Sequence, residues 1–230
     1  MISVENIEIC CNSRLSAENA KRGGAVRIEL CRELQCGGLT PGMDDVEYCV
    51  RKLGLETRVL IRPRPGDFCY NDEDWDSVRR DVARCGEIGA RAVVVGFLLE
   101  NGEIDMQRTK EAVRLAGNME VTFHRAFDEK LRTADDLELL MECGCSKLLT
   151  SGCAPTAAEG IEVLRRLQAA SAGSIGIVAA SGITPQNAAE IVARTGVSEV
   201  HGSCKVCRNG VMSTSEEQVR YLIRRLTNLG

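Results

Sequence analysis

The sequence of 230 residues has few aromatic side chains, no excess of basic residues and no long apolar run. Aromatic residues make up 3% of the chain, so its core must consist mostly of Val, Ile, Leu and Ala, which suits the interior of a parallel barrel. The formal net charge is -4, whereas proteins that bind the nucleic-acid backbone normally carry an excess of Lys and Arg. The composition therefore argues against a nucleic acid as partner.

Membrane and export signals are also missing from the sequence. No segment approaches the roughly 18 consecutive apolar residues of a membrane span. Residues 1–6 lack the basic and then apolar layout of a secretory signal. We therefore expect a cytoplasmic protein without a membrane partner. Its twelve cysteines are expected to be mostly reduced packing residues, as at Cys49 and Cys85 in predicted helices, because a chain of this size needs no disulfides to build a core.

One pattern recurs eight times along the chain: a short run rich in β-branched residues, a loop, and a helix that ends near a glycine. The spacing of these runs, roughly 22–33 residues, is typical of βα units with parallel strands. The predicted strands are Val4–Cys10, Val26–Cys31, Arg58–Arg62, Ala92–Gly96, Glu120–His124, Lys147–Thr150, Ser174–Ala179 and Glu199–His201. The fold class is therefore α/β, and we predict a single-domain (β/α)8 TIM barrel over residues 1–230, with an open doubly wound sheet as the alternative.

Capping signals place the helices between these strands. Thr133–Asp136 and Thr156–Glu159 resemble capping boxes, and Pro185 suits a first helical position. The last helix is expected over Ser215–Leu226, where apolar residues follow helical spacing. Glycines expected to end helices are Gly54, Gly86, Gly89, Gly144 and Gly196.

Alternation along the strands predicts which polar side chains face the barrel interior. Residues two apart on a strand share a face, and the Ile and Leu face must pack on the surrounding helices. The opposite, inward face of the first two strands then carries Glu8, Cys10, Glu29 and Cys31. The same reasoning turns His124 and His201, the two histidines of the chain, toward the interior.

Charged residues also gather where the predicted strands end. Arg62 and Arg64 share a face at the end of the third strand, which stops at Pro63. The C-terminal ends of the strands are where barrel enzymes carry their chemistry. The converging set therefore predicts a functional site at this mouth of the barrel. A purely structural ion-pair network among Glu8, Glu29, Arg62 and His124 is the alternative.

Several segments, in order along the chain, resemble the CutC family of copper homeostasis proteins. They are Gly23–Cys31, Gly37–Pro41, Ile61–Phe68, Thr122–Asp128 and Leu149–Gly152, with weaker similarity at Asn101–Asp105 and Glu199–Ser203. The resemblance implies a barrel fold, a cytoplasmic location, a homodimer or higher homo-oligomer, and copper handling. The cysteines that the family is proposed to use for Cu(I) correspond to Cys10 and Cys31. The sequence departs from the family after the seventh strand, where Val178–Ile183 contains a single glycine instead of a glycine-rich turn. A close approach of this backbone to an anion is therefore less certain.

Two hypotheses for function remain open at this point, a metal-binding protein and an enzyme, and they do not exclude each other. The first is Cu(I) binding by Cys10 and Cys31, because Cu(I) is soft and prefers thiolate ligands. Cys204 and Cys207 form a second candidate pair, but a lone CxxC motif outside the matched segments favours a packing role.

The second hypothesis is an enzyme acting on a small anionic metabolite, phosphorylated or not. Arginine offers a planar fork that matches carboxylate and phosphate groups. In this hypothesis Glu29 and His124 exchange protons, with Glu8 and His201 as weaker candidates. The residues predicted to bind the anion or order its site are Arg62, Arg64, Asp67, Arg125, Thr150, Ser151 and Gly152. Beyond Cu(I), no cofactor is predicted.

Overall fold

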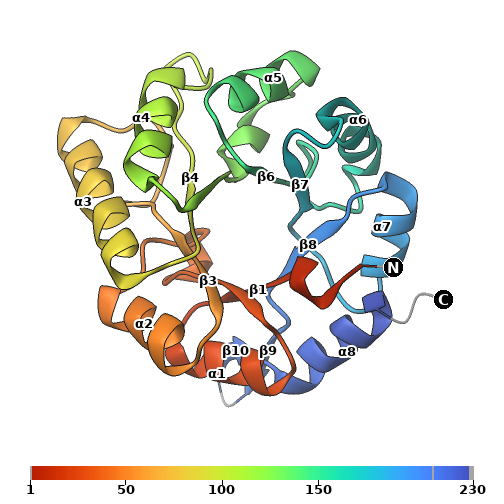
Figure 1. The fold of residues 1–230 in the computed structure, drawn as a ribbon. Helices are drawn as coiled ribbons and strands as arrows, with labels where there is room; N and C mark the ends of the chain where they lie inside the picture. Colours follow the sequence, from red (N-terminus) through yellow and green to blue (C-terminus); the bar gives the residue numbers. More distant parts are fainter. Residues whose placement is uncertain (1, 209, 228–230) are drawn as a thin grey trace.

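Eight parallel strands close into a barrel, and their order around it follows the chain, with β1 paired to both β2 and β8 (Figure 1). The structure is a computed structural model that describes residues 2–208 and 210–227. The strands are β1 (Ile7–Cys11), β2 (Arg27–Leu30), β3 (Glu56–Leu60), β4 (Ala92–Val95), β5 (Glu120–Phe123), β6 (Lys147–Thr150), β7 (Gly176–Ala179) and β8 (Glu199–Gly202). The predicted (β/α)8 TIM barrel is confirmed, and the open sheet is excluded by the pairing of β1 with β8.

Helices surround the barrel on its outside (Figure 1). They are α1 (Arg14–Arg22), α2 (Met43–Glu47), α3 (Asp72–Ile88), α4 (Met106–Ala116), α5 (Ala134–Glu142), α6 (Ile161–Ser171), α7 (Ala188–Thr195) and α8 (Glu216–Thr227). Short 3-10 helices η1 (Val4–Asn6), η2 (Leu34–Cys36) and η4 (Arg125–Glu129) and the π-helical turn η3 (Tyr48–Lys52) complete the secondary structure, apart from one hairpin. No helix within the described ranges is both long enough and apolar enough to cross a membrane.

Helix ends follow local capping chemistry in most places. The capping box predicted at Thr133 is present, since its side chain and that of Asp136 bond reciprocally to backbone N–H groups. Three predicted boundaries are wrong. Gly86 lies inside α3, because the helix continues to Ile88, which is buried. It ends at Gly89, whose φ of 91° is the left-handed conformation typical of a helix end. Thr156 caps only an isolated turn and α6 begins five residues later, and Pro185 lies in a turn before α7.

The barrel has an apolar outer layer and a more polar interior. Alternate strand residues such as Ile7, Ile9 and Ile28 are buried between the sheet and the helices in the main core. The opposite faces point into the barrel, where Cys10, Cys31, Leu60 and Val94 form one cluster and Leu149, Val178 and Ala180 another. The inward orientation predicted by alternation therefore holds.

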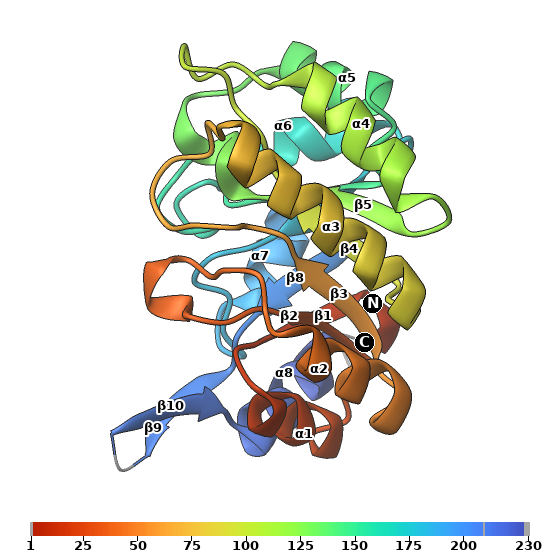
Figure 2. The ribbon, with the colours of Figure 1, turned by 90° about the vertical axis from the view of Figure 1, so that its left-hand side faces the viewer.

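A hairpin follows the last barrel strand, and the sequence interpretation missed it. Strands β9 (Lys205–Arg208) and β10 (Val211–Thr214) pair antiparallel and project from the body of the barrel, on the side where the strands end (Figure 2). Cys207 lies exposed on β9, whereas Cys204 just before it is buried. All twelve cysteines are free and eight are buried, as expected for packing residues, although Cys49 lies in η3 rather than in an α-helix.

Candidate functional site

A pocket of about 860 Å³ opens at the ends of the barrel strands. Seven of the predicted site residues line it, and these are Cys10, Glu29, Cys31, Arg62, His124, Arg125 and His201. The remaining predicted residues, Glu8, Arg64, Asp67, Thr150, Ser151 and Gly152, do not line it and contact neighbouring side chains instead. The structure thus brings the predicted thiols, both histidines and two of the arginines to one cavity.

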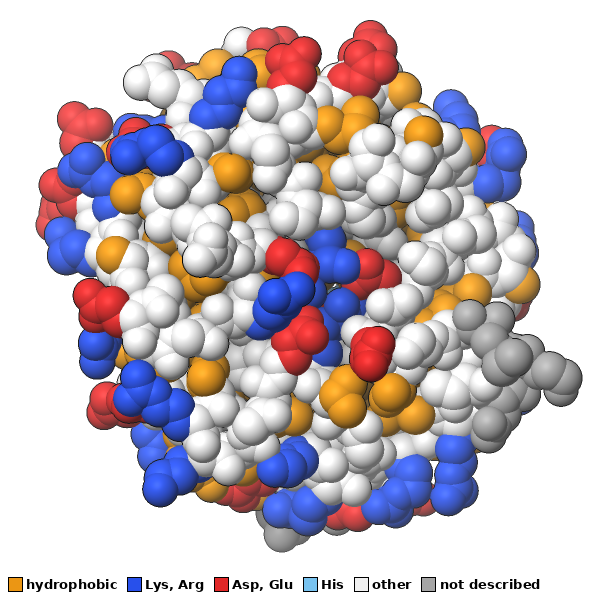
Figure 3. Space-filling view, viewed as in Figure 1, with side chains coloured by type: hydrophobic (Ala, Val, Ile, Leu, Met, Phe, Trp, Pro, Cys, Tyr) orange, Lys and Arg blue, Asp and Glu red, His pale blue; other side chains and the backbone are white. Residues whose placement is uncertain are grey.

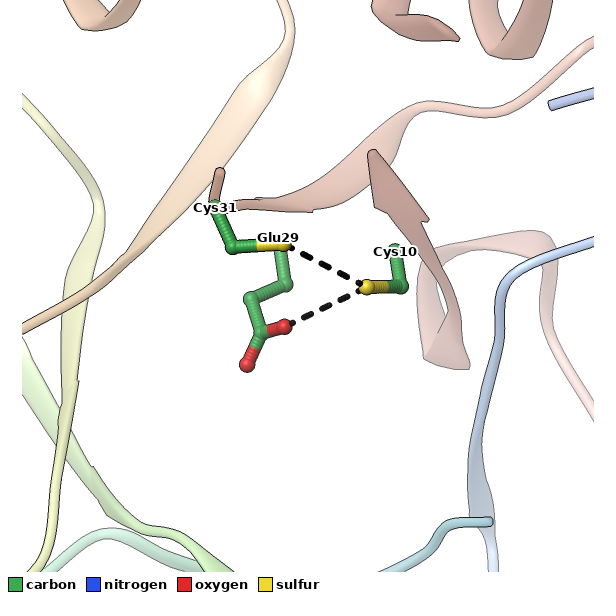
Figure 4. Close-up of side chains that lie close together, drawn as sticks. All are labelled: Cys10, Glu29 and Cys31. Atoms are coloured by element: carbon green, nitrogen blue, oxygen red, sulfur yellow. Dashed lines mark hydrogen bonds between the residues drawn. The ribbon is translucent and has the colours of Figure 1, made fainter. Parts of the chain in front are cut away.

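Two thiols lie side by side at the base of this pocket (Figure 4). Parallel pairing sets Cys10 opposite Glu29, and the N–H of Cys31 donates to the Cys11 carbonyl, which brings the two strand ends level. The Sγ atoms of Cys10 and Cys31 are 3.9 Å apart, and Cys10 Sγ lies 3.6 Å from Glu29 Oε2. Cys10 is 4% exposed and Cys31 is 2% exposed. The hydrogen bond with Cys31, together with burial, raises the pKa of Cys10 well above its usual value, so Cys10 is a neutral thiol at pH 7.

A histidine between two carboxylates lies directly beneath the thiols. His201 Nδ1 is 2.7 Å from Glu8 Oε1, and its Nε2 is 3.9 Å from Glu29 Oε2. Burial alone would lower the pKa of His201, but the charge of Glu29 and the hydrogen bonds to Cys10 and Glu8 raise it well above its usual value. Burial alone would raise the pKa of Glu8, but the hydrogen bond and charge of His201 lower it to about 2. His201 and Glu8 therefore form a buried ion pair, whereas burial raises the pKa of Glu29.

Ion pairs continue from Glu8 to the opposite end of the barrel. Arg27 and Arg58 approach Glu8 Oε2 at 3.6 and 3.3 Å, and Arg27 also reaches Glu199 at 2.7 Å. Arg58 also pairs with Glu120 at 2.9 Å. Viewed from the side where the strands begin, basic and acidic side chains gather at the centre of the barrel (Figure 3). A buried ion-pair network therefore exists, but it joins Glu8 to these arginines, and not to Arg62 and His124 as the structural alternative expected.

Arg62 binds backbone carbonyls rather than carboxylates. Its Nη1 donates to the carbonyls of Cys36 at 2.8 Å and Gly38 at 3.0 Å, and its Nη2 donates to that of Gly66 at 2.8 Å. The guanidinium lies over the Phe68 ring, 4.9 Å from its centroid. Arg62 Nε is buried without a hydrogen-bond partner. Arg62 thus fixes the loop that passes over Cys31, while its Nε–H makes none of these hydrogen bonds.

His124 faces the same pocket as a neutral imidazole. Its Nδ1 accepts a hydrogen bond from the Ala126 N–H at 3.1 Å, so the ring proton is on Nε2, which is buried without a partner. Burial and the charge of Arg62 lower the pKa of His124 to about 3. Gly96 makes room for the ring, because a Cβ there would lie 2.3 Å from His124 Nδ1. These features favour His124 as a hydrogen-bond donor near neutral pH.

Arg64 and Asp67 organise the loop after β3 outside the pocket. Arg64 pairs with Asp67 at 2.9 Å and with Asp74 at 2.7 Å. It also donates to the Cys69 carbonyl at 2.8 Å. These partners use the Arg64 fork to hold the loop against α3.

The loop after β6 already holds a carboxylate of the protein itself. Asp128 accepts hydrogen bonds from the Thr150 hydroxyl, from the N–H and hydroxyl of Ser151 at 2.9 Å each, and from the Cys153 N–H at 3.0 Å. Arg125 Nε pairs with the same carboxylate at 3.0 Å. Thr150 and Ser151 are therefore engaged with Asp128, which lines the pocket, and the Gly152 N–H donates to the Thr150 hydroxyl at 2.9 Å.

The loop after β7 keeps its tight turn despite having fewer glycines. Ser181 and Gly182 have φ of 72° and 70°, so a serine adopts the left-handed conformation that glycine usually supplies. The Ser181 hydroxyl donates to the Pro155 carbonyl at 2.8 Å, which helps to hold this conformation. Both residues line the pocket, so this turn forms one wall of the mouth.

Sequence reasoning missed several residues that build the site. Arg27 and Arg58 occupy inward positions two residues before Glu29 and four before Arg62, so alternation could have placed both in the interior. Phe68 lies in a loop and Asp128 in the short 3-10 helix η4, where strand alternation gives no signal, although both belong to segments that resemble the family. No sequence pattern indicated their contacts.

Comparisons with known proteins agree with this fold. The model of the CutC family matches residues 5–206. A CutC family protein of Vibrio vulnificus (strain CMCP6) is 39% identical over 209 residues, which cover 90% of this chain and 84% of the relative. One of Vibrio cholerae (strain M66-2) is 41% identical over 208 residues, covering 90% and 82%. A crystal structure of CutC from Streptococcus agalactiae superposes with a TM-score of 0.82 at 28% identity, over 88% of this chain and 99% of the other. The chain therefore belongs to the CutC family.

Proposed function

We propose that this protein binds Cu(I) in the cytoplasm through Cys10 and Cys31 and takes part in copper homeostasis. The observation that carries the proposal is the buried pair of thiols 3.9 Å apart at the base of an open pocket. Protein thiolates bind metals at about 2.3 Å, as in zinc sites, so one ion fits between these two sulfurs. Cu(I) prefers such soft ligands. The Streptococcus agalactiae protein is provisionally named a copper homeostasis protein, which supports the same role.

The surroundings of the thiols suit a metal that is taken up and released. Leu60 and Val94 pack on one side of the pair, while Glu29 lies on the other. Because Cys10 is a neutral thiol, metal binding must displace its proton, and Glu29 Oε2 at 3.6 Å is positioned to accept it. The apparent Cu(I) affinity should therefore rise with pH, by up to about a hundredfold per pH unit if both thiols lose a proton.

The test compares two double variants in a competition assay with a Cu(I) chelator under reducing conditions. Cys10→Ser with Cys31→Ser should remove one tightly bound Cu(I) per chain. Cys143→Ser with Cys145→Ser is the matched control, because these cysteines are also buried but lie between α5 and β6, outside the pocket. Unchanged Cu(I) binding in the first double variant contradicts the proposal. Thiol-dependent binding of Zn²⁺ in preference to Cu(I) contradicts it too.

A second candidate function, conversion of a small anionic metabolite, is favoured by Arg62. Within residues 2–208 and 210–227 its guanidinium has no carboxylate within ion-pair distance, although it is 6% exposed and lines the pocket. Glu29 and His201 line the same pocket and would supply proton transfer. Incubation with a metabolite extract, followed by mass spectrometry, should show a compound consumed by the wild type but not by Arg62→Met. An extract left unchanged by the wild type would oppose this candidate.

A further inference from the structure

Arg62 differs from the other buried arginines of the barrel. Arg27, Arg58, Arg62 and Arg132 are all 6% exposed or less. Arg27 and Arg58 pair with the carboxylates of the barrel floor, and Arg132 pairs with Asp136 at 3.0 Å. Arg62 donates to backbone carbonyls and lies near the Tyr70 hydroxyl, but it pairs with no carboxylate among the residues that the structure describes. Burying a charge is costly unless an opposite charge accompanies it, so the Arg62 guanidinium lacks the partner that the other three have.

A second unused donor accompanies this unpaired charge. His124 Nε2–H and Arg62 Nε–H are both buried without a hydrogen-bond partner, and both residues line the pocket. Buried polar groups in native proteins are nearly always hydrogen-bonded, so two unsatisfied donors on residues that line one pocket call for an acceptor. The Phe68 ring lies over both residues, with its centroid 4.9 Å from Arg62 Cζ and 4.9 Å from the centroid of the His124 ring.

Phe68 has the properties of a movable cover. Its backbone is fixed, because its carbonyl accepts a hydrogen bond from the Leu98 N–H at 2.9 Å, but its side chain is only half-buried. An aromatic face is a weak acceptor for N–H groups and for a guanidinium. Rotation of this side chain would uncover both donors to the pocket without moving the loop.

We infer that the mouth of the barrel binds a small organic carboxylate, whose oxygens accept hydrogen bonds from Arg62 Nε–H and His124 Nε2–H when the Phe68 ring moves aside. A carboxylate fits better than a phosphate, because one guanidinium and one neutral imidazole match a single negative charge. Apolar side chains of Leu34, Leu60 and Leu149 also line the pocket and can bury an organic tail. The inference deepens the second candidate function by naming the ligand class. If a carboxylate binds at this site without being converted, the inference about the site holds, and only the second candidate function is contradicted.

Nuclear magnetic resonance can test the site directly, because the chain has two histidines and histidine labelling with ¹⁵N gives only two imidazole spectra. The copper-free, reduced protein is titrated with sodium acetate or sodium butyrate at constant ionic strength. The His124 signals should shift and saturate, while those of His201 move little. Butyrate should bind more tightly than acetate, by about fourfold for each methylene that becomes buried. Phe68→Ala should strengthen binding, since no ring then has to be displaced.

Matched variants decide whether Arg62 and His124 form the site. Arg62→Met should abolish the saturable shift, whereas Arg132→Met should keep it, because Arg132 is equally buried and bound to carbonyls but has its own carboxylate. If Arg62→Met fails to fold, His124→Phe should lose the thermal stabilisation that butyrate gives the wild type. The inference is overturned if chloride shifts His124 as acetate does, if phosphate binds more tightly than butyrate, or if the folded variants still bind butyrate.

Discussion

Replacing Glu8 by Gln tests the ion pair on which the thiol site rests. Glu8 is 3% exposed and lies 2.7 Å from His201 and 3.3 Å from Arg58. Its pKa falls from 4.5 to about 2 in the folded chain. At about 1.4 kcal/mol per pKa unit, the charged form contributes about 3 kcal/mol to the free energy of unfolding at pH 7. A neutral glutamine keeps the shape of the side chain and removes this contribution.

The pH dependence distinguishes lost charge from disturbed packing. Because the folded-state pKa of Glu8 is lowered, its contribution is complete above pH 4.5 and disappears as the pH falls toward 2. Urea unfolding should therefore show Glu8→Gln less stable than wild type by about 3 kcal/mol at pH 7, but only by about 1 kcal/mol at pH 3. Glu5→Gln is the control, since Glu5 is exposed and forms no ion pair in the described part of the chain. Equal destabilisation by Glu8→Gln at both pH values would refute the electrostatic reasoning.

Three further predictions concern the pocket walls. Because the pKa of His124 is about 3 when folded, the unfolded chain alone takes up a proton between pH 6.5 and 3, so stability should fall by up to about 5 kcal/mol over this range in urea titrations, and less in His124→Phe. Gly96→Ala places a Cβ 2.3 Å from the His124 ring and should lower the unfolding free energy by about 2 kcal/mol, whereas Gly42→Ala, with open space around it, should not. A lower unfolding temperature for Gly42→Ala than for Gly96→Ala would contradict this reading. Asp128→Asn weakens charge-assisted hydrogen bonds to residues 151–153 and should cost about 2 kcal/mol, with faster amide exchange there; unchanged exchange would count against the anchoring role.

Much of the fold was predictable because it depends on local patterns. Eight apolar runs at regular spacing indicated the strands, and alternation along them placed Glu8, Cys10, Glu29 and Cys31 inside the barrel, where the structure has them. The hairpin β9–β10 was also within reach, since Asn-Gly is the dipeptide most typical of a two-residue hairpin turn and occurs at 209–210.

The partners of the polar side chains were not predictable in the same way. Alternation shows which face a residue occupies but not which loop passes over it. Arg62 and Arg64 were predicted as one clamp because they share a face. The loop after β3 instead carries Arg64 to Asp67 and Asp74, while Arg62 reaches carbonyls of the loop after β2. Such contacts depend on how separate loops pack together, which a single sequence does not encode in its spacing.

Among the residues that the structure describes, a charged floor fills the barrel on the side away from the pocket. Beneath the thiols the interior is filled by Glu8, Arg27, Arg58 and Glu199, all buried and ion-paired. If Cys10 and Cys31 bind Cu(I) as proposed, the ion would meet this charged layer on the inner side and would leave through the mouth of the barrel. The ion would then be taken up and released through the same opening, and would not pass through the barrel from one end to the other. Release of the metal ion would then depend on an acceptor molecule that enters the mouth and exchanges ligands with the ion there. The dissociation rate of the ion should therefore vary with the concentration and the size of the acceptor.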